Sequence, residues 1–292
     1  MSDFSWVAEP APLIALCAVF GLLVGSFINV VILRLPARLQ HDWRNQARDV
    51  LDIQTDDAAA ETAPPDLVFT GSHCPSCKHK LSALDNIPLL SWLALRGRCR
   101  YCKTPISAQY PLVETLTLIA SALIAWKFGL SAQMFAGLLL TWTLIAAAGI
   151  DARTQLLPDQ LTVPLMWLGL IISLFPIFVD PTSAIIGAAI GYLSLWSVFW
   201  LFKLVTGKEG MGYGDFKLLA ALGAWMGAMS LLPIILMSSL FGAVIGSIML
   251  KVQSQDRSTP IPFGPFIAIA GWVWFVFGEG LAAWYRGFFP AI

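Results

Sequence analysis

The chain has 292 residues, of which 57% are hydrophobic and only 12% are charged, and its mean hydropathy is +0.73. This composition excludes a water-soluble globular protein and is typical of a chain that lies mostly within a lipid bilayer. The 18 basic and 18 acidic residues cancel to a net charge of zero, which argues against nucleic acid as a partner.

Apolar stretches that are long enough to cross about 30 Å of hydrocarbon as helices recur along the chain. Those without a charged residue are 10–33, 128–150, 160–179, 181–202, 218–250 and 258–278, and 110–126 carries only Glu114. The stretch 218–250 would be about 50 Å long as one helix, so we divide it near Gly227, Ser230 and Pro233. The sequence therefore predicts an all-α polytopic membrane protein with about eight transmembrane helices, or seven if that stretch is one kinked helix.

Lysine and arginine residues indicate the orientation. Ten of them lie in the loop 34–108, whereas the residues before the first span contain none. Because loops rich in Lys and Arg stay inside, we expect this loop in the cytoplasm and the N-terminus on the other side. The N-terminal segment also lacks the basic start of a cleaved signal peptide, so residues 1–33 are interpreted as a retained transmembrane anchor. Alternation of the spans then brings Asp151 and Asp215 to the cytoplasmic face.

The cytoplasmic loop, taken as 34–109, contains two cysteine pairs. Its part 49–66 is acidic and rich in Ala and Pro, and we interpret it as a mobile linker. The pairs Cys74-Pro75-Ser76-Cys77 and Cys99-Arg100-Tyr101-Cys102 have the spacing of four thiolates that bind one zinc ion. Disulfides are the alternative, and a cytoplasmic location argues against them. The loop is therefore predicted to be a zinc-ribbon-like module, whereas Cys17 in the first span is interpreted as a packing residue.

Other residues of this loop have more than one interpretation. Basic side chains near the cysteines can offset the charge of a zinc–thiolate site, contact anionic lipid, or do both. They are Lys78, Lys80, Arg96, Arg98, Arg100 and Lys103. His73 and His79 flank the first pair and can replace a ligand, although four cysteines suffice. The segment 86–93 has the pattern of a capped, apolar helical turn that suits a membrane interface.

Two aspartates lie at the ends of apolar spans. Asp151 ends one span, and Asp215 closes the motif Gly212-Tyr213-Gly214-Asp215. A carboxylate so close to hydrocarbon is costly, so two of them favour a working pair, and our first hypothesis is an intramembrane aspartyl protease. Two carboxylates in one site cannot both ionise cheaply, so one polarises a peptide carbonyl while the other accepts a proton from water. Gly212 and Gly214, with Gly210, would let a peptide lie against Asp215 by close approach or positive φ.

Each acidic residue also has a plainer interpretation. Asp215 can cap the helix that follows it, and Asp151 can be a boundary charge paired with Arg153. Asp159, in Leu157-Pro158-Asp159, is interpreted as the N-cap of the next helix and is the reserve catalytic candidate. Glu114 can bind a substrate amine or be a boundary charge.

Taken together, the motifs resemble the bacterial type IV prepilin peptidases along almost the entire chain. They are Gly25-Ser26-Phe27-Ile28-Asn29-Val30 with Arg34 and Pro36, both cysteine pairs, Tyr110-Pro111-Leu112-Val113-Glu114, Ile150-Asp151 to Leu157-Pro158-Asp159, and Gly212-Tyr213-Gly214-Asp215-Phe216-Lys217. The resemblance implies a bifunctional enzyme of the bacterial inner membrane, and the Lys and Arg distribution then makes the N-terminus periplasmic. It implies cleavage of the basic leader of type IV prepilins or type II secretion pseudopilins. Methylation of the new N-terminal residue, usually Phe, would follow with S-adenosylmethionine.

The resemblance assigns catalysis to Asp151 and Asp215 and zinc binding to Cys74, Cys77, Cys99 and Cys102. We add Gly212, Gly214 and Glu114 as residues that support the substrate. The expected regions are an anchor at 1–33, the cytoplasmic loop at 34–109 and a membrane-embedded protease domain at 110–292. The loop has no Gly-rich turn of the dinucleotide-binding type, and Arg96-Gly97-Arg98 is our guess for the methyl-donor site.

Two other functions stay open at this point. A non-enzymatic transporter or assembly scaffold, with a zinc module that docks a partner, would tolerate substitution of both aspartates. A peptidase without methyltransferase activity would need the four cysteines for stability alone.

Overall fold

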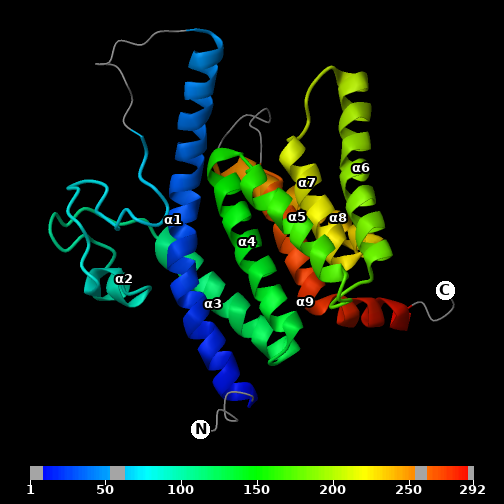
Figure 1. Cartoon of the computed structure of the whole chain (residues 1–292), viewed down its shortest axis with the longest axis horizontal. Coiled ribbons are helices and arrows are strands. Elements are labelled where there is room, and N and C mark those ends of the chain that lie inside the picture. Colours follow the sequence, from blue (N-terminus) through cyan, green and yellow to red (C-terminus); the bar gives the residue numbers. More distant parts are fainter. Residues whose placement is uncertain (1–8, 53–62, 254–261, 289–292) are drawn as a thin grey trace. The chain divides into compact units, whose positions relative to one another are not determined.

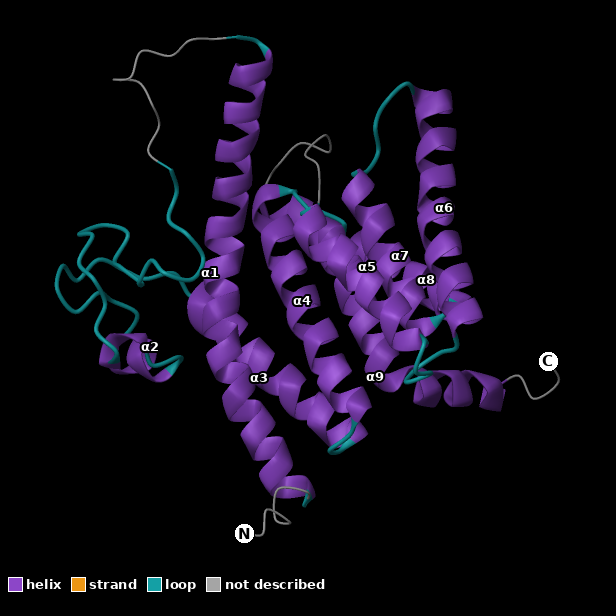
Figure 2. Ribbon diagram, in the orientation of Figure 1, coloured by secondary structure: helices purple, strands orange, loops and turns teal. Residues whose placement is uncertain are grey.

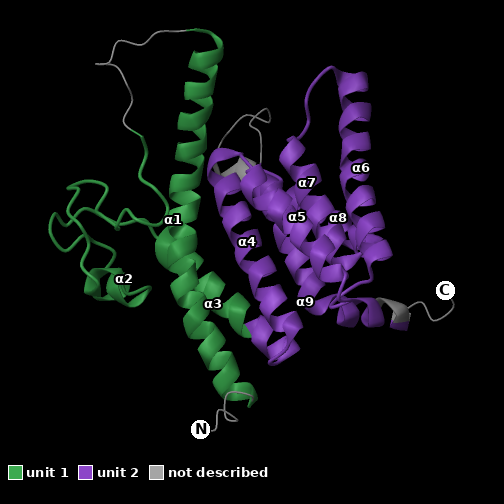
Figure 3. Ribbon diagram, viewed as in Figure 1, with its two compact units in different colours: residues 1–122 green, residues 123–292 purple. Residues whose placement is uncertain are grey.

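A computed structural model describes residues 9–52, 63–253 and 262–288 of the chain. The described residues form helices joined by turns, with two isolated β-bridges, which confirms the predicted all-α fold class (Figure 2). The chain divides into two compact units, residues 1–122 and 123–292 (Figure 3), and each is described by itself. The predicted linker 49–66 lies partly outside the described residues.

The first unit begins with a helix that is longer than the predicted anchor. Helix α1, Pro10–Val50, has 41 residues and includes Pro36, so it extends about 60 Å. A loop was predicted from residue 34 onward, but the helix continues to Val50, through the start of that loop. Most residues of 37–48 are strong helix formers, and Arg48 in the last turn complements the helix dipole.

Helix α3, Gln109–Phe128, packs closely against α1. A Cβ atom at Gly21 would lie 2.8 Å from the carbonyl oxygen of Thr117, and one at Gly25 would lie 2.8 Å from the Cα atom of Glu114. Glycines one turn apart allow this approach, as is common between membrane helices. The Nδ2 group of Asn29 donates to the carbonyl oxygen of Tyr110 at 3.1 Å, which ties the first turn of α3 to α1.

Between α1 and α3 lies the cysteine module, residues 63–108, which is mostly turns and loops (Figure 2). Its helical parts are the 3₁₀ turn η3, Leu84–Asn86, and the short helix α2, Leu90–Ala94. The guanidinium of Arg34 on α1 donates to the carbonyl oxygens of Asp66 and Thr70, both at 2.7 Å.

The second unit is a helical bundle around a buried helix (Figure 1). Its helices are α4, Ala132–Thr154; α5, Asp159–Ser173; α6, Pro181–Thr206; α7, Tyr213–Met226; α8, Leu231–Gln253; and α9, Gly264–Phe288. Every side chain from Leu218 to Leu222 on α7 is at most 1% exposed. With 14 residues, α7 is about 21 Å long, shorter than the hydrocarbon core. It therefore cannot cross the bilayer by itself, and its N-terminal end carries Asp215.

Small residues allow α6 to cross α7 at close range. A Cβ atom at Gly191 would lie 2.7 Å from the carbonyl oxygen of Leu219, and Gly187 and Gly223 exclude a Cβ atom at each other's position. On another face of α7, the indole of Trp225 donates to the carbonyl oxygen of Leu165 on α5 at 2.8 Å. These contacts fix the direction of α7 within the unit.

The predicted division of the stretch 218–250 is confirmed. Gly227 has φ of +75° and the 3₁₀ turn η4, Ala228–Ser230, follows it before α8 begins. Of the eight main helices described, six are long and apolar enough to cross a membrane, whereas α5 and α7 are too short to do so alone. α5 ends at Ser173, earlier than the predicted 179, because Pro176 follows it.

Candidate active site

Asp151 and Asp215 are both buried in the second unit. Asp151 lies in the last turn of α4 and is 5% exposed, and Asp215 lies in the first turn of α7 and is 6% exposed. The two residues lie on either side of Leu157, because Gly264, which bonds to Asp151, and Gly214, which directly precedes Asp215, both approach that leucine closely. A buried pair of carboxylates is costly and rare unless it has a function.

Asp151 has a specific hydrogen-bond donor. The backbone N–H of Gly264, the first residue of α9, donates to its Oδ2 atom at 3.0 Å. Its carboxylate is therefore buried and bonded to the start of another helix, which does not favour the alternative of a boundary charge paired with Arg153.

Asp215 has one oxygen ready for a partner. Its Oδ1 atom is buried and has no hydrogen-bond partner among the described protein atoms. The N-cap of α7 is Gly212, not Asp215, so the interpretation of Asp215 as a helix cap is wrong. A buried carboxylate oxygen left open costs stability, which is typical of a site that receives a water molecule or a substrate.

Two glycines allow the chain to close around this pair. A Cβ atom at Gly214 would lie 2.5 Å from the Cβ atom of Leu157, and one at Gly264 would lie 2.9 Å from the Cδ1 atom of the same leucine. Leu157, in the turn between α4 and α5, thus packs between the starts of α7 and α9. The close approach expected at Gly214 exists, but the contacting group is Leu157.

Gly212 differs from Gly214. A Cβ atom at Gly212 would lie 3.8 Å from the Oδ2 atom of Asp215, an ordinary van der Waals distance. Neither Gly210, Gly212 nor Gly214 has positive φ. The backbone freedom predicted for this motif is therefore not used here, and Gly212 borders Asp215 with room to spare.

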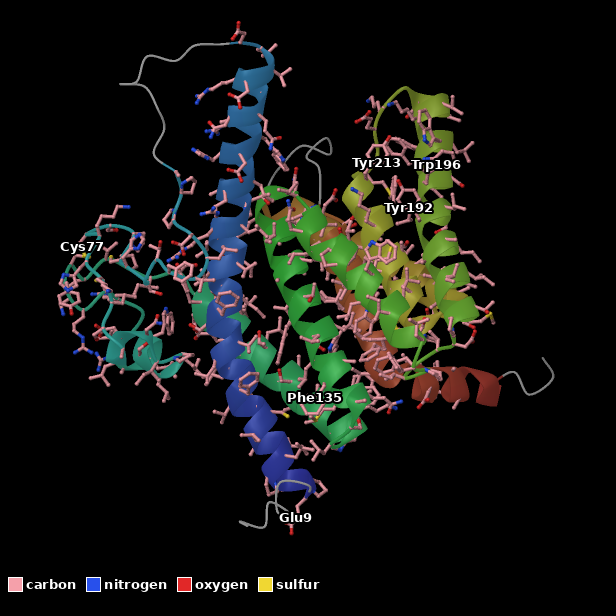
Figure 4. All side chains as sticks on the ribbon, viewed as in Figure 1. Glu9, Cys77, Phe135, Tyr192, Trp196 and Tyr213 are labelled. Atoms are coloured by element: carbon pink, nitrogen blue, oxygen red, sulfur yellow. The ribbon has the colours of Figure 1, made fainter. Side chains whose placement is uncertain are left out.

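An aromatic group packs against the other side of the first turn of α7. The ring of Phe216 lies 5.3 Å from Tyr213, 5.7 Å from Phe199 and 5.9 Å from Tyr192, all between ring centroids. Tyr213 and Tyr192 lie where α7 faces α6 (Figure 4). These contacts hold the turn that carries Asp215.

Asp159 is engaged elsewhere. Its two carboxylate oxygens accept from Nζ of Lys217 at 2.6 and 2.8 Å, and its side chain is 58% exposed. Pro158 is the N-cap of α5 and Asp159 the first helical residue, so the predicted capping role is wrong. The ion pair links α5 to α7, and this exposed carboxylate lacks the burial of the other two aspartates.

In the first unit, the four paired cysteines converge. Their sulfur atoms all lie within 4.8 Å of one another, and the Sγ atoms of Cys74 and Cys102 are 3.7 Å apart. Four thiolates around one zinc ion, with bonds of about 2.3 Å, stand about 3.8 Å apart. All four are free thiols, which disfavours disulfides, and the cluster fits a single metal ion. Cys77 marks its place in Figure 4.

The two pairs sit on equivalent turns. Cys74 N–H donates to the carbonyl oxygen of His79 at 3.0 Å, and Cys99 N–H donates to that of Thr104 at 2.9 Å. Each turn has a positive-φ residue directly after its second cysteine, Lys78 and Lys103, both with φ of +59°. Such turns point both thiols of a pair to one side.

His79, which was considered as a replacement ligand, stacks on Tyr101 at 3.6 Å between ring centroids. The group of possible metal ligands here consists of the four cysteines.

Two carboxylates outside the membrane-spanning helices brace the module. Asp85 accepts from Ser82 at 2.8 Å and from Arg100 at 2.6 Å, and these contacts lower the pKa of its carboxyl. Asp66 accepts from the hydroxyl and the backbone of Thr70 and from the backbone of Phe69 and Val68, which lowers its pKa to about 2. Both act as anchors for turns of the module.

Comparison with known proteins decides the family. The model of the "Bacterial Peptidase A24 N-terminal domain" matches residues 19–128, and that of the "Type IV leader peptidase family" matches residues 138–247. The chain belongs to the type IV leader peptidase family. Proteins named "Prepilin leader peptidase/N-methyltransferase" are similar to it, and two of them cover nearly all of it. The one from Stutzerimonas stutzeri is 54% identical over 99% of both chains, and the one from Pseudomonas aeruginosa is 51% identical over 96% of both. That from Xanthomonas campestris is 56% identical over 92% of both. No solved structure matches the chain.

As a member of the type IV leader peptidase family, the chain is an enzyme. Two further candidate residues, Glu114 and Gly97, lie in the first unit. Glu114 on α3 is 6% exposed, and its Oε2 atom accepts the backbone N–H of Leu89 at 2.7 Å. Gly97 has φ of +67°, and a Cβ atom there would lie 2.8 Å from Trp92. Both residues make structural contacts within the first unit.

Gly264 and Leu157 were not predicted as parts of the site. Leu157 was noticed only as a neighbour of Asp159. Gly264 lies in Pro262-Phe263-Gly264-Pro265 at the start of an apolar span. A glycine between prolines at a helix start is a signal for close approach that could have found it.

Proposed function

We propose that this chain removes the leader peptide of prepilin-type substrates and then methylates the new N-terminal residue. The observation that carries the proposal is the buried pair Asp151 and Asp215, held where α4, α7 and α9 meet, in a chain of the leader peptidase family. The printed names of its relatives support both activities. The alternative of a transporter or scaffold is not favoured, because the matching family model and the names of the relatives are those of a peptidase.

The proposed cleavage uses the two carboxyl groups in opposite protonation states. One accepts a proton from a water molecule while the other donates a hydrogen bond to the scissile carbonyl oxygen. The water oxygen attacks the carbonyl carbon, the tetrahedral adduct collapses, the C–N bond breaks and the leaving amine takes a proton. The N–H of Gly264 keeps the Asp151 carboxylate in place during these steps, and the unpartnered Oδ1 of Asp215 is the atom that would bond to water or substrate.

The proposed substrate has a basic leader in the cytoplasm and an apolar helix in the bilayer. We place the enzyme in the bacterial inner membrane with the N-terminus in the periplasm, because ten basic residues lie in 34–108. Asp151 and Asp215 then lie at the cytoplasmic face, level with the bond to be cut. Type IV prepilins and type II secretion pseudopilins both have this design.

Two cofactors belong to the proposal. We assign zinc to Cys74, Cys77, Cys99 and Cys102, whose soft thiolate donors suit it and would stabilise the module. S-adenosylmethionine, when bound, supplies the methyl group for the new N-terminal amine. The chain's own part is to hold that amine in place and accept the proton it loses. The segment Arg96-Gly97-Arg98 stays our candidate for the methyl-donor site, in which Gly97 adopts the positive φ of its turn.

The test is the mass of the product. The purified enzyme in detergent is given a prepilin-like peptide with and without S-adenosylmethionine, and the products are identified by mass spectrometry. We expect cleavage in both samples and one added methyl group only with S-adenosylmethionine. Cleavage without methylation would leave a peptidase alone, and no cleavage of pilin-type or pseudopilin-type peptides would reject the proposal.

A further inference from the structure

The cysteine module carries exposed apolar side chains at every third residue from 84 to 93. Leu84 is 70% exposed, Ile87 39%, Leu90 62% and Leu93 55%. Leu84 lies on η3 and Ile87 in the turn that follows it, whereas Leu90 and Leu93 lie three apart on α2 and are neighbours there. We propose that this row, here called the interfacial segment, inserts into the cytoplasmic leaflet of the membrane and binds anionic lipid.

The depth of the interfacial segment follows from one hydrogen bond. Leu89 N–H donates to Oε2 of Glu114 at 2.7 Å, and Glu114 is the sixth residue of α3. Glu114 therefore lies about 7 Å along α3 from its start. Leu112 and Leu116 on the same helix are 68% and 51% exposed, as expected of side chains that face lipid. The backbone of Leu89 is thus held at the height where α3 already contacts hydrocarbon.

The opposite end of the module is held farther from the bilayer. Asn29 on α1 bonds to Tyr110 at the start of α3, and Arg34 bonds to the carbonyl oxygens of Asp66 and Thr70. Arg34 is five residues beyond Asn29, about 7 Å farther along α1. The module is therefore fixed at two heights, with Leu89 on the membrane side and Asp66 on the water side.

The interfacial segment is also rigidly tied to the chain that enters the membrane. The indole of Trp92 donates to the carbonyl oxygen of Ile106 at 3.2 Å, and Ile106 N–H donates to that of Gly97 at 2.8 Å. Ile106 precedes α3 by three residues. A segment so connected follows the depth of α3 and does not swing into the cytoplasm.

Charge selects the lipid. Arg96 and Arg98, directly after α2, are exposed, and further exposed basic residues of the module are Lys78, Lys80 and Lys103. Apolar side chains beside Lys and Arg are the pattern of an interfacial anchor on an anionic membrane. A transmembrane substrate is another candidate to cover an apolar face. Both ends of the module continue into membrane helices, however, so lipid surrounds this row even when no substrate is bound.

The test is photocrosslinking of the whole enzyme in lipid nanodiscs that contain phosphatidylglycerol. p-Benzoylphenylalanine replaces Leu90 or Leu93 in two variants, and Phe69 in a matched control. Phe69 is 92% exposed but lies at the Asp66 end of the module. We expect lipid adducts, read as intact mass, at positions 90 and 93 and several-fold fewer at 69. Equal adducts at all three positions, or adducts to a protein at 90 and 93, would overturn the proposal.

A second measurement needs no substitution. Amide hydrogen exchange of residues 84–95 is compared in nanodiscs with phosphatidylglycerol and with phosphatidylcholine alone. Since one basic residue near an anionic surface shifts binding about fivefold, exchange should be at least about fivefold slower with phosphatidylglycerol, and salt should reduce the difference. Exchange of residues 66–72 should not change. Equal exchange of 84–95 in both lipids would contradict an anionic-lipid site.

Discussion

The backbone N–H of Gly264 donates to the Oδ2 atom of Asp151 at 3.0 Å, although 113 positions separate the two residues. α9 begins at this glycine, so the start of the last helix orients one of the two buried carboxylates. A Cβ atom at position 264 would lie 2.7 Å from that same oxygen. The contact therefore requires glycine.

Gly264→Ala should lower cleavage strongly. The added methyl group would displace Asp151 or the start of α9, and a misplacement of about 1 Å in a catalytic site costs on the order of 10²-fold in rate. The measurement is kcat/KM with a prepilin-like peptide. Gly280→Ala on the same helix is the control, because a Cβ atom there meets no atom within 4 Å. Equal rates for the two variants would show that the Gly264 contact is unimportant.

The two motif glycines should differ in stability. Gly214→Ala would place a Cβ atom 2.5 Å from that of Leu157, whereas the nearest atom at Gly212 is 3.8 Å away. Overpacking of this kind costs about 1–3 kcal/mol, so Gly214→Ala should lower the Tm in detergent and Gly212→Ala should leave it close to wild type. A lower rate for Gly212→Ala at unchanged Tm would support its proposed role beside the substrate. A similar loss of Tm in both variants would contradict the geometry.

Asp159→Asn should have a mild effect. It removes the ion pair with Lys217, in which the side chain of Asp159 is 58% exposed and that of Lys217 is 31% exposed. Exposed ion pairs contribute about 0–1 kcal/mol to stability. Cleavage should continue within a few-fold of wild type. Loss of all cleavage in a folded Asp159→Asn variant would return this residue to the catalytic candidates.

Cys77→Ser should separate the two proposed activities. Cys77 is exposed, so the substitution removes a thiolate ligand with little loss of packing. We expect loss of bound zinc, measured by elemental analysis, and loss of methylation, with cleavage retained. Cys17→Ala, which alters the cysteine outside the cluster, should keep both zinc and methylation. Normal methylation by zinc-free Cys77→Ser would limit the module to a structural role.

Apolar runs and glycines predicted most of the fold, because a helix in lipid needs only length and hydrophobicity. The break at Gly227 was predicted because one helix of 218–250 would be too long. The extension of α1 past Pro36 was not, since charged residues looked like loop although they form helix well. Hydropathy alone also gave no sign that α5 ends at Ser173, because the apolar run continues past Pro176 to residue 179.

The site was predictable where chemistry is local and not where it depends on packing. Asp151, Asp215 and the four cysteines were identified because carboxylates at a membrane edge and paired thiols are unusual by themselves. The role of Gly264 arises from a contact between helices far apart in sequence, so the prolines around it could mark a close approach but not its partner Asp151. The same holds for Glu114, whose bond to Leu89 became visible only with the fold.

The most direct test of the central claim is the cleavage rate of Asp151→Asn and Asp215→Asn in detergent. Asp180→Asn is the matched control, because Asp180 caps α6 from an exposed position. If the two buried carboxylates activate water together, each of the first two variants should fold, bind the peptide and cleave about 10²–10⁴-fold more slowly, while Asp180→Asn stays near wild type. Cleavage at the wild-type rate by either folded active-site variant would contradict the aspartyl mechanism.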